Sequence, residues 1–451
     1  MCFTAEQILK ATGGVFFGAS CDEISIKSVS TDSRSIREGA LFVPIVGERF
    51  DGHDFIEQAV NLGAACVLSE KKIEGSRFPY ILVRCTRQAL LDIASFYLGT
   101  FDVKVVGLTG SAGKTTTKDM LASVLSKKYR TKKTIGNFNN DIGLPLSVFG
   151  LEKGDEVIVL EMGMNHAGEI RKLTKAAKPD VAIITNIGFA HIENFKDQNG
   201  ILQAKLEIVE GLKNGGSVFL NGNDPLLAGE DAVKKTEGMS VFHPGEENVK
   251  SVKSLGLSGS ECHFCFDGKD VFVTVPLPGS HMVTNALLTC AVCLHMGMSP
   301  EEISHGFLEY EPTLGRLNVI QANKMTVIND VYNASPDSVK NALSVLAREG
   351  GRKVAILGDM LELGDYAKKL HEEVGIYAAS LGIDVLVTIG SLAKHMFDGF
   401  TSIKGAGENA KAFETKSDFL AVSEKILKAC DVVLVKASRG AKFEEITEKL
   451  I

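Results

Sequence analysis

The feature that most constrains the fold is a repeated pattern of short, β-branched apolar runs, each followed by a loop and an amphipathic helical segment. From residue 103 these runs are VKVVGLTG, EVIVLEMG, DVAIITNIG and GSVFLNGND. The pattern breaks at YEPTLGR (310–316), where Pro312 and Gly315 interrupt it, and restarts with MTVIND, KVAILGD, DVLVTIG and DVVLVKAS. Such runs are typical of buried parallel strands in an α/β sheet, so both later blocks are predicted to be doubly wound sheets.

The length of the chain agrees with this division. At roughly 150 residues per domain, 451 residues suggest about three domains. The first block mixes short strands and helices and ends in the helical pattern QALLDIASFYLG. We therefore predict an α/β protein with a small N-terminal α/β domain (1–101), a central parallel-sheet domain (102–312) and a C-terminal Rossmann-like domain (313–451).

Composition excludes several classes of protein. With 49 Lys+Arg against 56 Asp+Glu, the formal charge is −7, which argues against a duplex-binding protein. The absence of Trp and the presence of only seven Tyr make a stacking platform for single-stranded nucleic acid improbable. No signal peptide or apolar run of membrane-spanning length is evident, so we expect a cytoplasmic monomer with no nucleic-acid or integral membrane contact.

The nine cysteines favour reduced, buried thiols over a disulfide framework. Cys262-x2-Cys265 and Cys290-x2-Cys293 loosely resemble a four-thiolate zinc site. However, the first pair lies in a strand-like stretch, where residues three apart point to opposite faces, and the second lies in a helical pattern. Packing is therefore favoured over zinc binding.

The stretch GLTGSAGKTTTKDM (107–120) follows a predicted strand and opens a predicted helix. Glycine at two of its positions allows backbone amides to face an anion, Lys114 can reach outer phosphates, and the Thr115 hydroxyl can ligate Mg²⁺. The pattern G-x4-G-K-[ST] fails at one place, because Leu108 replaces the first Gly. We predict an ATP-binding loop, with an ordinary glycine-rich turn as the alternative. Its residues are Gly110, Ser111, Ala112, Gly113, Lys114, Thr115 and Thr116.

Two polar residues directly after predicted strands are candidate metal ligands. Glu161 stands where a second Mg²⁺ ligand would lie, although it could also be a first-turn acid favoured by a helix dipole. His191 lies just beyond another strand end, where the plainer interpretation is a hydrogen-bonded structural histidine. The expected position of His191 beside Glu161 and the phosphate loop favours metal ligation by His191.

Lys205 is the most unusual residue of the chain. The segment 200–213 is predicted to be one helix, and on a helical wheel Lys205 falls near the centre of its apolar stripe, aligned with Ile201 and Val209. An unpaired ammonium group would be costly to bury there. Either Lys205 snorkels to solvent, or it lies under the active site, paired or converted by CO₂ into an anionic carbamate.

These residues together resemble the Mur ligase family, the ATP-dependent amino-acid and peptide ligases of bacterial peptidoglycan precursor synthesis. The resemblance covers nearly the whole chain. The phrases that carry it are TGSAGKTTTKDM, IGNFNNDIGLPL (135–146), INDVYNASPDSV (328–339), AILGDMLELG (355–364) and TDSR…GALFVPIVGERFDGHDF (31–55). They favour the member that joins D-alanyl-D-alanine to UDP-N-acetylmuramoyl-tripeptide, through an acyl phosphate formed with ATP.

The resemblance implies roles for individual residues. The first domain would hold the UDP moiety, and Thr115 with Glu161 would form a first Mg²⁺ site, while His191 with a carbamylated Lys205 would form a second. Asn285 would contact adenine, Asp330 the ribose and Arg316 the phosphates, so that Lys114, Glu161, His191, Lys205 and Arg316 are the predicted catalytic residues. The predicted substrate-binding residues are Asp32, Ser33, Arg34, Gly47, Asn139, Asn140, Tyr332, Asn333, Lys436, Ser438 and Arg439.

Two positions depart from the family pattern. Met282 stands where the family usually has Asn, and Ala437 replaces a usual Gly. The plainer interpretation of Arg316, Asp330 and Arg439 is that of surface ion pairs. Other functions that we considered are another Mur-type or folylpolyglutamate-type amide ligase, and a catalytically silent nucleotide-sugar-binding homologue.

Overall fold

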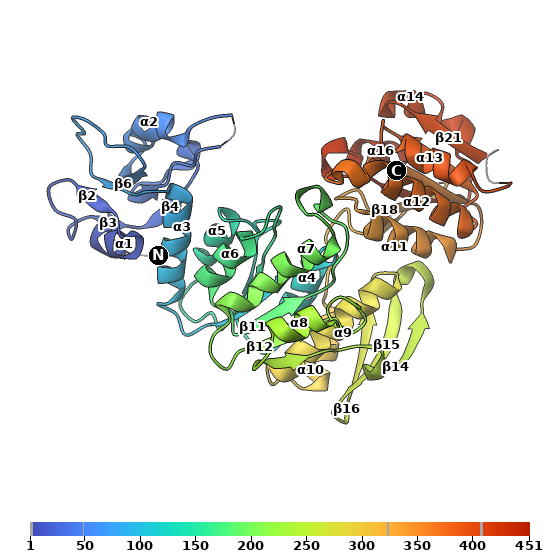
Figure 1. Cartoon of the computed structure of the whole chain (residues 1–451), viewed down its shortest axis with the longest axis horizontal. Helices are drawn as coiled ribbons and strands as arrows, with labels where there is room; N and C mark the ends of the chain where they lie inside the picture. Colours follow the sequence, from blue (N-terminus) through green and yellow to red (C-terminus); the bar gives the residue numbers. More distant parts are fainter. Residues whose placement is uncertain (1–2, 48, 323, 406–408) are drawn as a thin grey trace.

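The computed structural model describes residues 3–47, 49–322, 324–405 and 409–451. Its helices and strands form three α/β units along an elongated molecule, with the N-terminal unit (blue) at one end and the C-terminal unit (orange to red) at the other (Figure 1). The predicted fold class is therefore confirmed. The predicted boundaries fall in loops, because α3 (Thr86–Leu98) precedes β8 (Lys104–Thr109) and α10 (Pro300–Leu308) precedes β17 (Asn318–Gln321).

The N-terminal unit is a mixed sheet with short helices. Its strand order is β2 (Val15–Phe17), β7 (Tyr80–Leu82), β6 (Ala64–Ser69), β5 (Ala40–Phe42) and β4 (Ser28–Ser30). β2 pairs with β7 antiparallel, and the other pairs are parallel. β1 (Phe3–Thr4) and β3 (Ser25–Ile26) pair separately, and the other helices are α1 (Ala5–Thr12) and α2 (Ile56–Asn61).

The central unit is built on a parallel sheet. Its order is β13 (Ser240–Phe242), β12 (Ser217–Leu220), β11 (Val181–Ile184), β8, β10 (Val157–Glu161) and β9 (Thr131–Lys133). The four predicted runs form β8, β10, β11 and β12, and β10, β11 and β12 are buried at every residue. The helices of this unit are α4 (Lys114–Leu125), α5 (Gly143–Val148), α6 (Glu169–Ala177), α7 (Gln198–Leu206), α8 (Glu230–Lys235), α9 (Ser280–His295) and α10.

The helix predicted over 200–213 is wrong beyond Leu206. α7 ends there, and residues 207–211 form a 3₁₀ helix. A tertiary contact accompanies this change: the Thr174 hydroxyl donates to the carbonyl of Ile208 at 2.6 Å, and the Leu212 amide bonds the Val209 carbonyl. Sequence periodicity gives no sign of this competing donor.

A separate antiparallel sheet, which the strand pattern did not distinguish, extends the central unit. It contains β14 (Val249–Ser254), β15 (Ser260–Phe266) and β16 (Lys269–Val275). Cys262 on β15 is buried while Cys265, on the other face, is only partly buried, and Cys290 and Cys293 are buried in α9. Burial raises the pKa of Cys262 to about 11, and the buried Cys262, Cys290 and Cys293 pack as apolar groups.

The C-terminal unit repeats the doubly wound plan. Its order is β17, β18 (Thr326–Asn329), β22 (Val432–Lys436), β19 (Lys353–Gly358), β20 (Val385–Ile389) and β21 (Ala410–Phe413), and only the pairing of β17 with β18 is antiparallel among the described strands. The four predicted runs are β18, β19, β20 and β22. Its helices are α11 (Pro336–Ala347), α12 (Ala367–Ser380), α13 (Lys394–Thr401), α14 (Lys416–Leu420), α15 (Ser423–Ile426) and α16 (Glu444–Leu450).

Candidate active site

A pocket of about 330 Å³ lies between the central and C-terminal units. Loops after β8, β10 and β11 contribute one side, and loops after β18, β19 and β22 contribute the other. This is where open α/β sheets bind ligands. The predicted site residues in its lining are Ser111, Ala112, Gly113, Lys114, Thr115, Thr116, Asn139, Glu161, His191, Arg316, Asp330, Tyr332, Asn333, Lys436 and Arg439.

The phosphate loop has the backbone that its glycines were predicted to allow. Gly110 has φ +156° and Gly113 has φ +77°, and a Cβ at Gly110 would lie 1.9 Å from the Thr185 hydroxyl oxygen. Gly113 caps α4, whose first-turn amides have no intrahelical acceptors and can receive an anion. Lys114 Nζ donates to the Gly110 carbonyl at 2.7 Å, and burial is the main reason that its pKa is lowered.

Thr115 and Glu161 meet beneath this loop. The Thr115 hydroxyl donates to Glu161 Oε2 at 3.0 Å, and Asn139 Nδ2 donates to Oε1 at 2.8 Å. Glu161 is the last residue of a buried strand, so the first-turn interpretation is wrong. A hydroxyl and a carboxylate are oxygen donors suited to Mg²⁺, and this pair fits the predicted first metal site.

Lys118 was missed by the sequence reasoning. It is 2% exposed, lies 4.0 Å from Glu161 Oε2 and donates to the Gly136 carbonyl at 3.0 Å. Its position one turn beyond Lys114 on α4 was visible in the sequence, but its burial was not. It places a positive charge beside the Glu161 carboxylate at the end of β10.

Arg316 links the two units across the pocket. Its Nη2 donates to the Thr115 hydroxyl at 2.9 Å, and its guanidinium carbon lies 4.0 Å from the ring centroid of Tyr332. Its Nε is buried and has no hydrogen-bond partner among the described residues. Arg316 is therefore not a surface ion pair, and an unpartnered buried donor in a pocket is a ready contact for a phosphate oxygen.

Arg439 remains at the rim. It is 67% exposed on its side chain, pairs with Glu444 at 3.0 Å and lies 5.2 Å from the Tyr332 ring centroid. For this residue the surface ion pair is confirmed. Its backbone amide donates to Asn333 Oδ1 at 3.3 Å.

Asp330 and Lys436 form a buried pair at the ends of β18 and β22. Lys436 Nζ donates to Asp330 Oδ2 at 2.5 Å and to the Asn333 carbonyl at 2.9 Å. Burial raises the pKa of Asp330, and Lys436 opposes that shift. His281, which sequence reasoning missed, also lines the pocket, and burial together with Lys436 lowers its pKa to about 4.

The two departures from the family pattern are accommodated. Asn285 is buried behind the phosphate loop, outside the pocket lining, and its Nδ2 lies 3.9 Å from Met282 Sδ, while Met282 itself lines the pocket. Ala437 is fully buried and has no left-handed backbone, so alanine introduces no strain there. Ser438 accepts from the Leu361 amide at 2.9 Å and is buried outside the lining.

Lys205 does not snorkel. It is 2% exposed on α7, and among the described residues no hydrogen bond or ion pair reaches its Nζ. Burial, followed by the positive charge of Lys114, lowers its pKa well below the ordinary value. No acidic partner for Lys205 Nζ is present among the described residues, and the neutral form of an amine is the one that reacts with CO₂.

His191 pairs with a residue of the C-terminal unit. Its Nδ1 lies 2.7 Å from Oε2 of Glu362, which is in the loop after β19. The hydrogen bond from His191 is the main cause of the lowered pKa of Glu362. An imidazole held by a carboxylate at Nδ1 is the usual arrangement of a metal-ligating histidine, with Nε2 left for the metal. Among the described residues no cluster of three or more His, Cys, Asp or Glu side chains suits a metal.

The predicted UDP-binding residues lie in the N-terminal unit, outside this pocket. Asp32 caps a short 3₁₀ helix and pairs with Arg34 at 2.8 Å, which holds its pKa at about 2, while Ser33 is buried. The Gly47 amide donates to the Phe50 carbonyl at 2.9 Å; of its loop, residue 48 lies outside the described residues.

Arg87, unnoticed in the sequence, connects that loop to the central unit. It bonds Asp141 at 3.0 Å and the Val46 carbonyl at 3.3 Å. Asn140 accepts from the Gly143 amide at 2.8 Å and caps the start of α5. The first-unit loop and the Asn139–Asn140 stretch therefore lie near each other, as a shared substrate groove would require.

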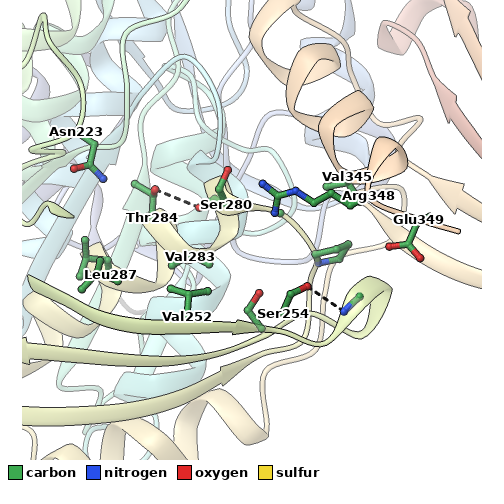
Figure 2. A pocket seen from close by; sticks show the side chains of 15 residues that line it. Asn223, Val252, Ser254, Ser280, Val283, Thr284, Leu287, Val345, Arg348 and Glu349 are labelled. Carbon is green, nitrogen blue, oxygen red and sulfur yellow. Dashed lines mark hydrogen bonds between the residues drawn. The ribbon is translucent and has the colours of Figure 1, made fainter. Parts of the chain in front are cut away.

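A second pocket, of about 370 Å³, lies between the β14–β16 sheet, α9 and the end of α11 (Figure 2). Ser280, Val283 and Thr284 of α9 face it, together with Val252 and Val345. It contains none of the predicted site residues. The pocket that holds the phosphate loop is therefore the candidate active site.

Comparison with known proteins agrees with this geometry. Family models match the chain over residues 108–293 (Mur ligase middle domain), 315–439 (Mur ligase, glutamate ligase domain) and 25–97 (Mur ligase family, catalytic domain). The chain belongs to the Mur ligase family. This member is 39% identical to the UDP-N-acetylmuramoyl-tripeptide--D-alanyl-D-alanine ligase of Bacillus subtilis, over 99% of this chain and 98% of the relative. It is 33% identical to the enzyme of the same name from Escherichia coli, over 99% and 98%.

Solved structures give the same result for this family member. It superposes on MurF of Acinetobacter baumannii with a TM-score of 0.93 at 32% identity, covering 100% of this chain and 99% of that one. MurF ligase of Thermotoga maritima, in complex with ADP, gives 0.83 at 31% identity, covering 94% and 96%. A folylpolyglutamate synthase of Mycobacterium tuberculosis gives 0.65 at 16% identity, which shows a shared fold alone.

Proposed function

We propose that this protein is the ATP-dependent ligase that joins D-alanyl-D-alanine to UDP-N-acetylmuramoyl-tripeptide in peptidoglycan precursor synthesis. The observation that carries the proposal is the pocket between the units, where Lys114, Thr115 and Glu161 face Arg316 and Asp330. It is supported by full-length relatives of that name at 39% and 33% identity. We also propose that the domain boundaries lie at the predicted positions, after residues 101 and 312.

The residues of the pocket suggest which group acts at each step of the reaction. Lys114 and Arg316 would hold the phosphates of ATP while its γ-phosphoryl group passes to the terminal carboxylate of the tripeptide, giving an acyl phosphate. The amine of D-alanyl-D-alanine would then displace phosphate and form the amide. Both steps concentrate negative charge, which fixed cations stabilise. No side-chain nucleophile is required.

Two Mg²⁺ sites belong to the proposal. Thr115 and Glu161 would hold one ion, and His191 with a carbamate on Lys205 would hold the other. Bound Mg²⁺ supplies charge neutralisation to the phosphate groups. The buried, unpartnered Lys205 amine supports the carbamate, because its burial favours the neutral form that reacts with CO₂.

The first prediction tests the reaction itself. ADP release should require UDP-N-acetylmuramoyl-tripeptide and D-alanyl-D-alanine together, and the product should be the UDP-linked pentapeptide, measured by coupled assay and mass spectrometry. ADP release with free amino acids in place of the dipeptide would contradict the acceptor. Absence of ADP release with every acceptor would contradict the proposal that the protein is an enzyme.

A further inference from the structure

One carboxylate of the pocket keeps an oxygen that the proposed phosphate chemistry does not use. Three acidic residues line it, counting the described residues only: Glu161, Asp330 and Glu362. Glu161 is 1% exposed and bonded by Thr115 and Asn139, while Asp330 is 9% exposed and bonded by Lys436. Glu362 differs, because its side chain is 47% exposed.

Only one oxygen of Glu362 is engaged. Oε2 pairs with His191 Nδ1 at 2.7 Å, and Oε1 has no hydrogen-bond partner among the described residues. The pocket is otherwise lined by the cations Lys114, Arg316, Lys436 and Arg439. A free carboxylate oxygen there is of no use to a phosphate, which it repels. It suits a cationic group of a ligand.

The loop after β19 is built to hold Glu362 in place. The Met360 amide donates to Nε2 of the buried His371 at 3.0 Å, and the Leu361 amide donates to Ser438 at 2.9 Å. Leu363 is buried at 1% exposure. Glu362 itself has φ +65°, a left-handed conformation that is costly for a residue with a Cβ. Such strain persists only where neighbouring contacts enforce it, and it is concentrated at functional positions.

The loop also meets the central unit. The Glu193 amide donates to the Glu362 carbonyl at 3.4 Å, and the Tyr366 hydroxyl donates to the Lys196 carbonyl at 2.7 Å. Glu362 therefore reaches the pocket from the C-terminal unit, beside the residues that would hold the γ-phosphate and the acyl phosphate. The attacking amine of the acceptor has to arrive at this same place.

We propose that Glu362 is the specificity residue that receives the ammonium group of the acceptor dipeptide. This inference rests on the proposed function, since it concerns the same acceptor. Oε1 would accept a hydrogen bond from the ammonium while Oε2 stays on His191. The carboxylate thus brings the amino group to the acyl phosphate. The ammonium loses one proton to solvent, its nitrogen lone pair attacks the acyl carbon, and phosphate leaves as the amide forms.

The test separates acceptor binding from acyl phosphate formation. In Glu362→Gln the KM for D-alanyl-D-alanine should rise about 10- to 100-fold, the usual range for loss of a charged hydrogen bond, while the KM values for ATP and UDP-tripeptide are unchanged. Hydroxylamine, a small neutral nucleophile, should trap the acyl phosphate as the hydroxamate at the wild-type rate, because it needs no carboxylate and because the Gln amide oxygen can still accept a hydrogen bond from His191 Nδ1. Asp365→Asn, an exposed acid-to-amide change three residues further along the loop, is the matched control and should resemble wild type.

Two results would overturn the inference. An unchanged KM for the dipeptide would show that Glu362 does not contact the amine. A fall in hydroxamate formation parallel to ligation would assign Glu362 to phosphoryl transfer through His191. Both are distinct from failure of the proposed function, in which the wild-type protein releases no ADP with these substrates.

Discussion

At the scale of single residues, buried charge separates the site from the surface. Lys205 and Lys118 are each 2% exposed, yet only Lys118 has a carbonyl and a carboxylate within reach. Burying an unpaired ammonium is expensive, and burial is the main reason that the pKa of Lys205 is lowered. Arg316 also has a buried donor, its Nε, that has no partner among the described residues.

Lys205→Ala should lower ligation by about 100-fold, as does the loss of a group that stabilises transition-state charge. Bicarbonate should not restore activity. Incubation of wild type with ¹³CO₂ should give a carbamate signal by ¹³C NMR that the variant lacks. Lys213→Ala, an exposed lysine paired with Asp180 at 2.8 Å, should keep both the signal and the activity. Full activity in Lys205→Ala would contradict the carbamate.

At the scale of elements, the strand-to-helix turn between β8 and α4 decides whether ATP can bind. The two glycines of this turn have left-handed or otherwise unusual backbones, with φ +156° at Gly110 and φ +77° at Gly113. They also leave no room for side chains. A Cβ at Gly113 would lie 2.9 Å from Asn285 Oδ1.

Gly113→Ala should therefore destabilise the protein by about 1–2 kcal/mol from the backbone alone and also weaken nucleotide binding. The measurement is thermal unfolding with and without ATP, since a ligand that binds the native state raises Tm. Gly75→Ala is the matched control: Gly75 has φ +66° but nothing within 4 Å of an added Cβ. It should show the strain and keep the ATP-induced shift. A wild-type ATP-induced rise in Tm in Gly113→Ala would contradict the role of this turn in binding the phosphates.

At the scale of the whole molecule, function depends on contacts between units. Besides the pairs of Arg316 with Thr115 and of Glu362 with His191, Asp337 at the start of α11 accepts from the Phe189 amide at 3.0 Å. Burial raises the pKa of Asp337. The loop that carries His191 is thus held from the C-terminal unit at two points.

No helix of the described residues is long and apolar enough to cross a membrane.

Asp337→Ala should loosen this arrangement, because it removes the acceptor of the partly buried Phe189 amide, a loss of about 0.5–1.5 kcal/mol. We expect kcat to fall by up to about tenfold. With a bound ATP analogue, small-angle scattering should give a larger radius of gyration than for wild type. Glu373→Ala, which removes a surface pair with Lys340 inside the C-terminal unit, should change neither. An unchanged radius in Asp337→Ala would contradict a role in closure.

The sequence by itself determined what depends on local pattern. Apolar runs predicted the strands β8, β10, β11 and β12 and their counterparts in the last unit, because burial on both faces leaves a continuous apolar run. The glycines and Lys114 predicted the phosphate loop, because its chemistry requires residues adjacent in the chain. The apolar stripe around Lys205 predicted an unusual lysine, although it left snorkelling open.

Tertiary structure decided what depends on residues far apart in the chain. The 3₁₀ segment after Leu206 is contacted by the Thr174 hydroxyl, Lys205 is buried by the packing of α7, and His191 pairs with Glu362 from another unit. Thr174 and Glu362 are both far along the chain from the residues that they contact, so local sequence patterns do not reveal these contacts. Periodicity reports which face of an element is buried, whereas only the fold determines which group from a distant segment arrives at that face.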